Sequence, residues 1–253
     1  MPNHENPFAF NAEADKTVTV SGRGPTNLNA FVSPVNLQKT VSVLLGLFGL
    51  LCILTLISSG MQLSLLDEAL QGVGPNFDQR AEENDNRELA VNMLVLVSML
   101  VVGIVSLKLL HRLRSNVDHL GAIGLSNTPG WSVGWFFVPL ANLIKPLGAT
   151  RETWQASIAP DAWQTETAPP VLGTWWFFWI TASIVGRVAS RLPSIAGNSI
   201  ESLITATWVD MGHTTLTMMA AFMYWKVLSG ITTAQTETYQ SMAAESPPDQ
   251  WKY

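Results

Sequence analysis

The chain has 253 residues, of which 47% are hydrophobic and only 13% are charged. An ordinary soluble domain has about 25% charged residues, and the apolar residues here gather in blocks long enough to cross a bilayer, so the composition indicates an integral membrane protein. The net charge of −5 comes without a basic cluster, which disfavours a nucleic-acid partner. The single cysteine, Cys52, leaves no second thiol for an internal disulfide or a thiolate metal site.

Residues 1–38 are polar, rich in Asn, Pro and Thr, and show no sustained periodicity. This composition predicts a polar N-terminal tail without a packed core of its own. The stretch contains charged residues and no apolar central region, which argues against a cleaved signal peptide. We therefore expect the first membrane helix to act as the targeting signal.

Two membrane helices are predicted in the first half of the chain, over residues 41–63 and about 89–110, because each contains some 20 apolar residues. The acidic stretch between them, residues 67–88, carries several turn-forming residues and is expected to be a solvated loop. After the second span an apolar stripe continues through Leu109, Leu113 and Val117, which predicts an amphipathic extension of the helix. Arg112 and Arg114 mark this end as cytoplasmic.

Residues 126–157 are ambiguous between a short span and a segment that stays at one membrane surface. Thr128 followed by Pro129 is typical of a helix start. The apolar run that follows has only about 14 residues and is interrupted by Pro139 and Pro146, which is too short and broken for a comfortable span. Keeping the segment on the cytoplasmic side also places more Lys and Arg there than a crossing would. We therefore predict a re-entrant or interfacial element within residues 110–157.

The stretch TPGWSVGWFFVPLANLIKPLGATRETW resembles an uncharacterised bacterial family of multi-span membrane proteins that is known only as a domain of unknown function. The resemblance covers about residues 40–230 and depends on Pro-Gly-Trp followed by a second Trp, on P-x-x-N and on K-P. It implies a bacterial membrane protein, without implying an activity. The residues that we assign to a membrane-surface signature are Trp131, Trp135, Pro139, Asn142, Lys145, Pro146 and Glu152.

Two further membrane helices are predicted over residues 171–192 and 201–229, followed by a polar C-terminal tail over residues 231–253. With the first pair they form a membrane domain over residues 39–230. An even number of crossings places both termini on the cytoplasmic side of the inner membrane. The predicted fold class is therefore all-α, an integral membrane four-helix bundle with an additional re-entrant or interfacial segment.

The last two predicted spans contain or adjoin five ionisable residues that we select as a polar site: Arg187, Arg191, Glu201, Asp210 and His213. Because a charge at membrane depth is costly, such residues normally pair, and we expect Arg187 with Asp210 or Arg191 with Glu201. A proton relay, an ion path or an anionic-headgroup site would use these groups functionally. The structural alternative is a buried ion pair that only fixes helix pairing.

No catalytic or nucleotide-binding motif is present, and the histidines lack metal-ligand spacing, so the sequence predicts no metal and no cofactor and favours a protein without enzyme activity. A membrane bundle with a surface element and polar tails favours an accessory or scaffolding subunit of a membrane protein assembly. Its expected partners are the lipid bilayer and either another membrane protein or a second copy of the chain. The alternative is a small transporter, channel or lipid-binding membrane protein that uses the intramembrane charges.

Overall fold

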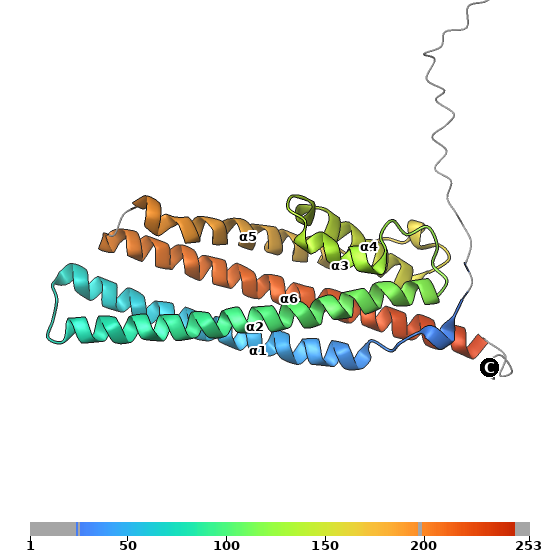
Figure 1. The fold of residues 1–253 in the computed structure, drawn as a ribbon, viewed down its shortest axis with the longest axis horizontal. Helices are drawn as coiled ribbons and strands as arrows, with labels where there is room; N and C mark the ends of the chain where they lie inside the picture. Colours follow the sequence, from blue (N-terminus) through green and yellow to red (C-terminus); the bar gives the residue numbers. More distant parts are fainter. Residues whose placement is uncertain (1–23, 25, 197–198, 246–253) are drawn as a thin grey trace, which may run out of the picture.

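The computed structural model describes residues 24, 26–196 and 199–245, and every regular element within them is a helix. Four helices are long: α1 (Val35–Gln71), α2 (Phe77–His119), α5 (Pro170–Ala196) and α6 (Ile200–Glu245). Two shorter ones, α3 (Pro129–Gly134) and α4 (Lys145–Ile158), lie together toward one end of the elongated molecule (Figure 1). The all-helical part of the predicted fold class is thus confirmed.

The long helices form two hairpins, α1 with α2 and α5 with α6, which are joined mainly by packing of α6 against α1 (Figure 1). Helix α6 also contacts α2 and α4, so it touches each of the other three long helices. All four long helices contribute buried side chains to the central core, among them Val41, Leu109, Leu113, Trp175, Val227, Leu228 and Ile231.

Three helical stretches are long and apolar enough to cross a membrane: Leu28–Gln71, Phe77–His119 and Pro170–Leu192. This agrees with the predicted membrane character. Helix α6 lies outside that set although it is the longest, because threonines, Asp210 and His213 interrupt its apolar residues.

The acidic stretch over residues 67–88 is mostly helical, so the prediction of a long solvated loop was wrong. Helix α1 continues to Gln71 and α2 begins at Phe77, which leaves a connection of residues 72–76. Gly72 and Asn76 adopt positive φ angles of 120° and 59° there, and both residue types tolerate that conformation. The turn-forming residues that suggested a loop are confined to this short connection, whereas the Glu, Gln and Arg residues on either side are good helix formers.

The predicted polar tails also differ from the structure in part. Helix α6 continues to Glu245, since Gln235 and Met242 are buried against the rest of the molecule. At the other terminus, the backbone N–H of Gly24 donates to Gly121 and that of Asn27 donates to His119, so this segment runs along the end of α2. Most of the predicted N-terminal tail, residues 1–23, lies outside the described residues, as do residues 246–253.

Residues 126–158 fold back on themselves as a helical hairpin at one end of the molecule. Thr128 accepts a hydrogen bond from the backbone N–H of Trp131 and Pro129 occupies the first turn, so the predicted helix start is confirmed. The chain reverses near Pro139 and Leu140, where Leu140 has a φ of 65°, and α4 then begins at Lys145. We call α3, α4 and the adjoining ends of α2 (residues 108–119) and α6 (residues 230–245) the helical platform.

Candidate functional site

A group of polar side chains links α1, α2 and α6 at the end of the molecule away from the platform, and we call it the boundary cluster: Ser58, Arg87, Glu88, Asp210 and His213. Ser58 is buried and its hydroxyl donates to Glu88 over 2.5 Å. Arg87 donates to the same hydroxyl oxygen over 2.9 Å and to the carbonyl oxygen of Ser58 over 3.2 Å. The Arg87 guanidinium and the Glu88 carboxylate are 3.6 Å apart. The cluster therefore holds both charge signs.

Asp210 and His213 belong to the same cluster from the side of α6. Asp210 lies within electrostatic range of His213 and of Glu88 on α2. The Nδ1 atom of His213 is 3.0 Å from the carbonyl oxygen of Ala182 on α5. Since that oxygen can only accept, Nδ1 carries the proton and donates it.

The absence of a side chain at Gly186 permits the close approach of His213 to α5. A Cβ atom at Gly186 would lie 2.7 Å from Cε1 of the imidazole ring, too close for an ordinary contact. Gly186 therefore faces α6, and the next residue, Arg187, points about 100° further round the helix. This geometry explains why Arg187 is exposed.

The predicted ion pair between Arg187 and Asp210 is not formed among the described residues. Asp210 instead lies within electrostatic range of His213 on the same helix, whose positive form attracts the carboxylate, and of Glu88 on α2, whose negative charge repels it. Arg191 and Glu201 are both exposed near the same end of the α5 and α6 hairpin. Sequence reasoning thus found Asp210 and His213 but missed Ser58, Arg87 and Glu88, whose positions depend on the helical continuation of α2.

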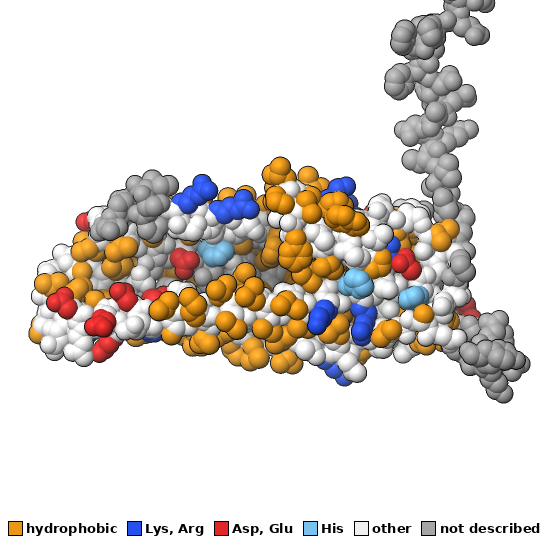
Figure 2. Space-filling model, in the orientation of Figure 1, with side chains coloured by type: hydrophobic (Ala, Val, Ile, Leu, Met, Phe, Trp, Pro, Cys, Tyr) orange, Lys and Arg blue, Asp and Glu red, His pale blue; other side chains and the backbone are white. Residues whose placement is uncertain are grey.

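Between the boundary cluster and the platform the four long helices carry no Asp, Glu, Lys or Arg. The charge-free stretches are residues 40–66, 89–107, 170–186 and 211–225. Their register is fixed by hydrogen bonds from Gln38 to Ser229 (2.7 Å) and from Trp225 to Ser42 (3.0 Å), and at the other end by the contact between Ser58 and Glu88. The stretches therefore overlap as one belt, and Figure 2 shows hydrophobic side chains along the middle of this face, with most acidic groups at one end and Lys or Arg side chains on both sides of the apolar region.

The belt is about 30 Å tall along α2, because Glu88 and Lys108 are 20 residues apart and a helix rises about 1.5 Å per residue. The boundary cluster therefore lies at one edge of the belt and not at its centre. Asp210 had been expected at membrane depth from the position of α6 in the sequence alone. Its proximity to Glu88 places it near the edge of the belt instead.

The membrane-surface signature forms the exposed side of the platform. Trp131 and Trp135 lie with ring centroids 4.5 Å apart, and the Lys145 ammonium is 5.6 Å from the centroid of the Trp135 ring. Pro139 is exposed, Asn142 is half-buried and Pro146 is buried in the first turn of α4. Leu140 and Ile144, beside them, are 79% and 74% exposed. The tip of this hairpin thus presents apolar side chains next to a lysine.

Polar contacts behind the signature fix the hairpin to the bundle. Asn127 accepts a hydrogen bond from the indole of Trp135 (2.7 Å) and donates to Glu152 (3.2 Å). Glu152 also accepts from the backbone N–H of Ser126, while Arg114 binds the carbonyl oxygen of Asn127 and pairs with Asp118. Sequence reasoning assigned Glu152 to the signature but gave no role to Asn127, since nothing in the local pattern marks it.

A second polar network, fully buried, joins the platform to the bundle. Gln235 donates to the carbonyl oxygen of Leu113 (2.6 Å) and to the Ser157 hydroxyl (3.1 Å), and it accepts from Asn116 (3.1 Å). Asn116 in turn holds the backbone of Val32 through both of its amide atoms. These neutral groups fix α2, α4 and α6 relative to one another, and they were all missed from sequence because their pairings are long-range.

Within the described residues no three His, Cys, Asp and Glu side chains are grouped so as to hold a metal ion. The boundary cluster does place a carboxylate, an imidazole and a second carboxylate near one another at the edge of an apolar belt. Such a group can bind a proton, or it can hold helices together. The groups of the cluster are acids and bases that lie where the apolar belt meets the charged end of the helices.

The helical architecture, with an uncharged belt across the long helices, defines a class of candidate multi-span membrane protein. Residues 76–233, well over half of the chain, match a family described as Domain of unknown function (DUF4328), and the chain belongs to that family. The matched region runs from the start of α2 through the platform, α5 and most of α6. Neither the curated proteins nor the solved structures include a match to this chain.

Proposed function

We propose that the chain is an inner-membrane protein in which α1, α2, α5 and α6 cross the bilayer as a four-helix bundle. The belt supports this arrangement, because its height along α2 equals the thickness of a typical hydrocarbon core, about 30 Å. Helix α6 crosses although it is less apolar than the others. His213 contacts the backbone of α5, and Thr207 accepts a hydrogen bond from Gln62 of α1, so neighbouring helices cover these two polar residues. The exposed Thr215 donates to the carbonyl oxygen of Met211 within α6, which satisfies its hydroxyl without water.

The platform occupies the cytoplasmic surface in this proposal, and both termini lie on that side. Basic residues gather at the platform edge of the belt, where Lys39, Lys108 and Lys226 end the charge-free stretches of α1, α2 and α6. The opposite ends of α1 and α2 carry mostly acidic residues. An excess of Lys and Arg favours the cytoplasmic side. The hairpin of residues 129–146 then dips into that surface with Leu140 and Ile144 toward the lipid, as an interfacial or re-entrant segment.

The function that the geometry supports best is an accessory or scaffolding subunit of a membrane assembly, without catalysis of its own. One observation carries this proposal: α5 and α6 approach so closely at Gly186 and His213 that no solute fits between these two helices at that level. A buried network of neutral side chains meanwhile stiffens the platform. A rigid platform held at the membrane surface suits the docking of another protein better than the passage of a solute.

The test is purification of the full chain from native membranes in nanodiscs, followed by measurement of the particle mass and identification of each stoichiometric component. A particle with a defined second protein is the expected result. A particle that contains only this chain, as monomer or homo-oligomer, overturns the accessory-subunit proposal.

A small transporter or ion-binding protein is the second candidate, because the boundary cluster brings Glu88, Asp210 and His213 together. Asp210→Asn separates the two functions, since it removes the charge but keeps the side-chain shape. An accessory subunit with this substitution retains its partner and the partner's activity. Loss of a proton or cation flux from an otherwise intact particle would instead favour the transporter. Glu201→Gln, which changes an exposed acid on the same helix, is the control.

A further inference from the structure

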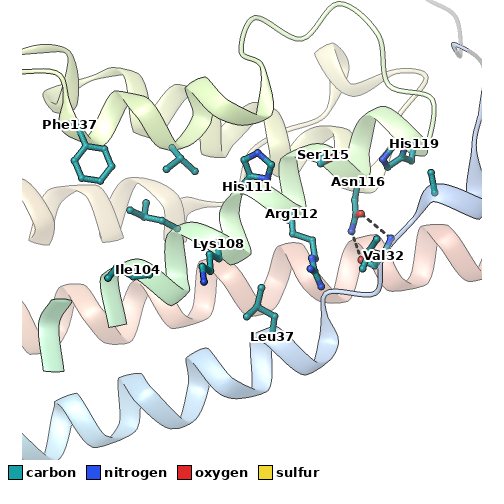
Figure 3. Close-up of a pocket in the computed structure, with 13 residues that line it drawn as sticks. Val32, Leu37, Ile104, Lys108, His111, Arg112, Ser115, Asn116, His119 and Phe137 are labelled. Atoms are coloured by element: carbon teal, nitrogen blue, oxygen red, sulfur yellow. Dashed lines mark hydrogen bonds between the residues drawn. The ribbon is translucent and has the colours of Figure 1, made fainter. Parts of the chain in front are cut away.

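A groove of about 650 Å³ lies at the platform edge of the belt, between α2, the segment that leads into α1, and α3 with the turn after it. Figure 3 shows its floor as one face of α2, with Leu37 on one side and Phe137 on the other. Lys108 and Arg112 point toward the α1 side, whereas His111 points toward α3. Four basic or potentially basic side chains line it: Lys108, His111, Arg112 and His119.

The groove is cationic because no acidic side chain lines it. The nearest acid along α2, Asp118, pairs with Arg114 over 2.7 Å, and Glu152 accepts hydrogen bonds from Ser126 and Asn127. Within the part of the chain that the structure describes, neither Lys108 nor Arg112 forms an ion pair. Their charges are therefore available to an external anion.

The groove is apolar at the end nearer the belt and cationic at the other end, as a membrane changes from acyl chains to headgroups. Ile104 and Phe137, which are 57% and 72% exposed, lie at the end nearer the belt. Lys108 is the first charged residue after the uncharged stretch of α2, and Arg112 and His119 follow one and three turns later. The groove thus has an apolar half at the height of the acyl chains and a cationic half at the height of the headgroups.

We propose that this groove binds the headgroup of an anionic phospholipid. The phosphate lies between Lys108 and Arg112, where a bidentate guanidinium contact and an ammonium charge both suit it. An acyl chain follows Ile104 and Phe137 into the belt, which a free phosphate ion has no means to exploit. The site would hold one lipid against the junction of the platform with the bundle. The proposal requires the membrane embedding described above but not the accessory-subunit function.

The test uses the purified full chain in neutral detergent, titrated with short-chain phosphatidylglycerol and observed by native mass spectrometry. We expect a single saturable lipid adduct, weakened by roughly tenfold or more in the double variant Lys108→Gln/Arg112→Gln. The matched control is Lys39→Gln/Arg151→Gln, which removes the same charge from exposed positions outside the groove lining and should bind as the unaltered chain does. Phe137→Ala, at an exposed position, should also weaken lipid binding while leaving the charges in place.

Three outcomes overturn the proposal. Equal binding of phosphatidylcholine excludes headgroup charge as the basis of recognition. Equal loss of binding in the double variant and in its control assigns the effect to net charge rather than to the groove. Competition by millimolar inorganic phosphate identifies a soluble anion as the ligand. None of these results alters the particle composition in nanodiscs, so failure of the lipid site and failure of the proposed function remain distinguishable.

Discussion

The platform network and the boundary cluster both place polar side chains between packed helices, but they differ in charge and in burial. In the platform, Asn116, Ser157 and Gln235 are at most 1% exposed and all neutral, and each has fixed partners. In the boundary cluster, Arg87 and Glu88 are charged and retain 29% and 17% side-chain exposure. Burying an amide that keeps its hydrogen bonds costs little, whereas burying a charge costs several kcal/mol even when it is paired. These neutral groups can therefore lie deep, whereas Arg87 and Glu88 stay partly exposed, and the one buried guanidinium of the described platform, that of Arg114, pairs with Asp118 and donates to the carbonyl oxygen of Asn127.

This difference assigns different tasks to the two regions. The platform network stabilises the packing of α2, α4 and α6, since the loss of any member leaves other buried groups without hydrogen-bond partners. In the boundary cluster Arg87 and Glu88 are partly exposed, so a group that loses its partner there can still be hydrated. Substitutions in the first region should therefore alter stability strongly, and substitutions near exposed charges should alter it weakly.

The largest effect is expected for Gln235→Leu, which keeps the side-chain volume but removes the hydrogen bonds to Leu113, Asn116 and Ser157. The free energy of unfolding should fall by about 3 kcal/mol, because buried polar atoms lose their partners in a region of low dielectric. Thermal unfolding in detergent measures the change. Gln240→Leu, at an exposed site on the same helix, should have almost no effect. Equal melting temperatures for the two variants would show that the network does not stabilise the platform.

A smaller effect is expected at the contact between α4 and α6. A Cβ atom at Gly230 would lie 2.1 Å from Cη2 of Trp154, so Gly230→Ala forces the indole or one of the helices to move. The cost should be about 2 kcal/mol. Gly212→Ala is the matched control, since nothing lies within 4 Å of a Cβ there, and it should stabilise α6 slightly. A Gly230→Ala protein that melts no earlier than the control would contradict this close approach.

The sequence predicted those parts of the fold that depend on local patterns. Thr128 and Pro129 start α3 as expected, because a cap and its first turn are adjacent in the chain. The apolar stripe of Leu109, Leu113 and Val117 likewise continues α2 and is buried. Residues 231–245 appeared to be a tail because Gln235 and Thr238 are polar. They form a helix because α2 and α4 supply partners from more than 75 residues away.

The sequence identified some residues of the candidate site but not the contacts between them. Asp210 and His213 stood out as ionisable residues in an apolar helix, but their partners depend on helix register. Gly186 rather than Arg187 faces His213, and Glu88 reaches Asp210 only because α2 begins at Phe77 instead of near Leu89. The cationic groove combines residues from three segments, so no pattern within α2 alone distinguishes Lys108 and Arg112 from an ordinary basic membrane flank.

The smallest effect concerns an exposed ion pair beyond the boundary cluster. Two guanidinium hydrogen bonds from Arg80 join Glu68 across the connection of residues 72–76 and lower the pKa of the Glu68 carboxyl below its ordinary value. Because the pKa is lowered in the folded state, the contribution to stability is present above the ordinary carboxyl pKa and is lost as pH falls through the lowered one.

Hydrogen exchange of the amides in residues 72–76 measures this contribution locally. Glu68→Gln should exchange faster than the unaltered protein at pH 7, by a small factor that high salt removes, because both partners are solvent-exposed. At a pH low enough to protonate Glu68 in the unaltered chain, the two proteins should exchange alike. Glu82→Gln removes an exposed acid of the same helix hairpin and should change nothing at either pH. A difference between Glu68→Gln and the unaltered protein that persists in acid would assign the protection to helix packing rather than to the ion pair. The exposed end of the hairpin would then be stabilised by packed neutral groups, as the platform is.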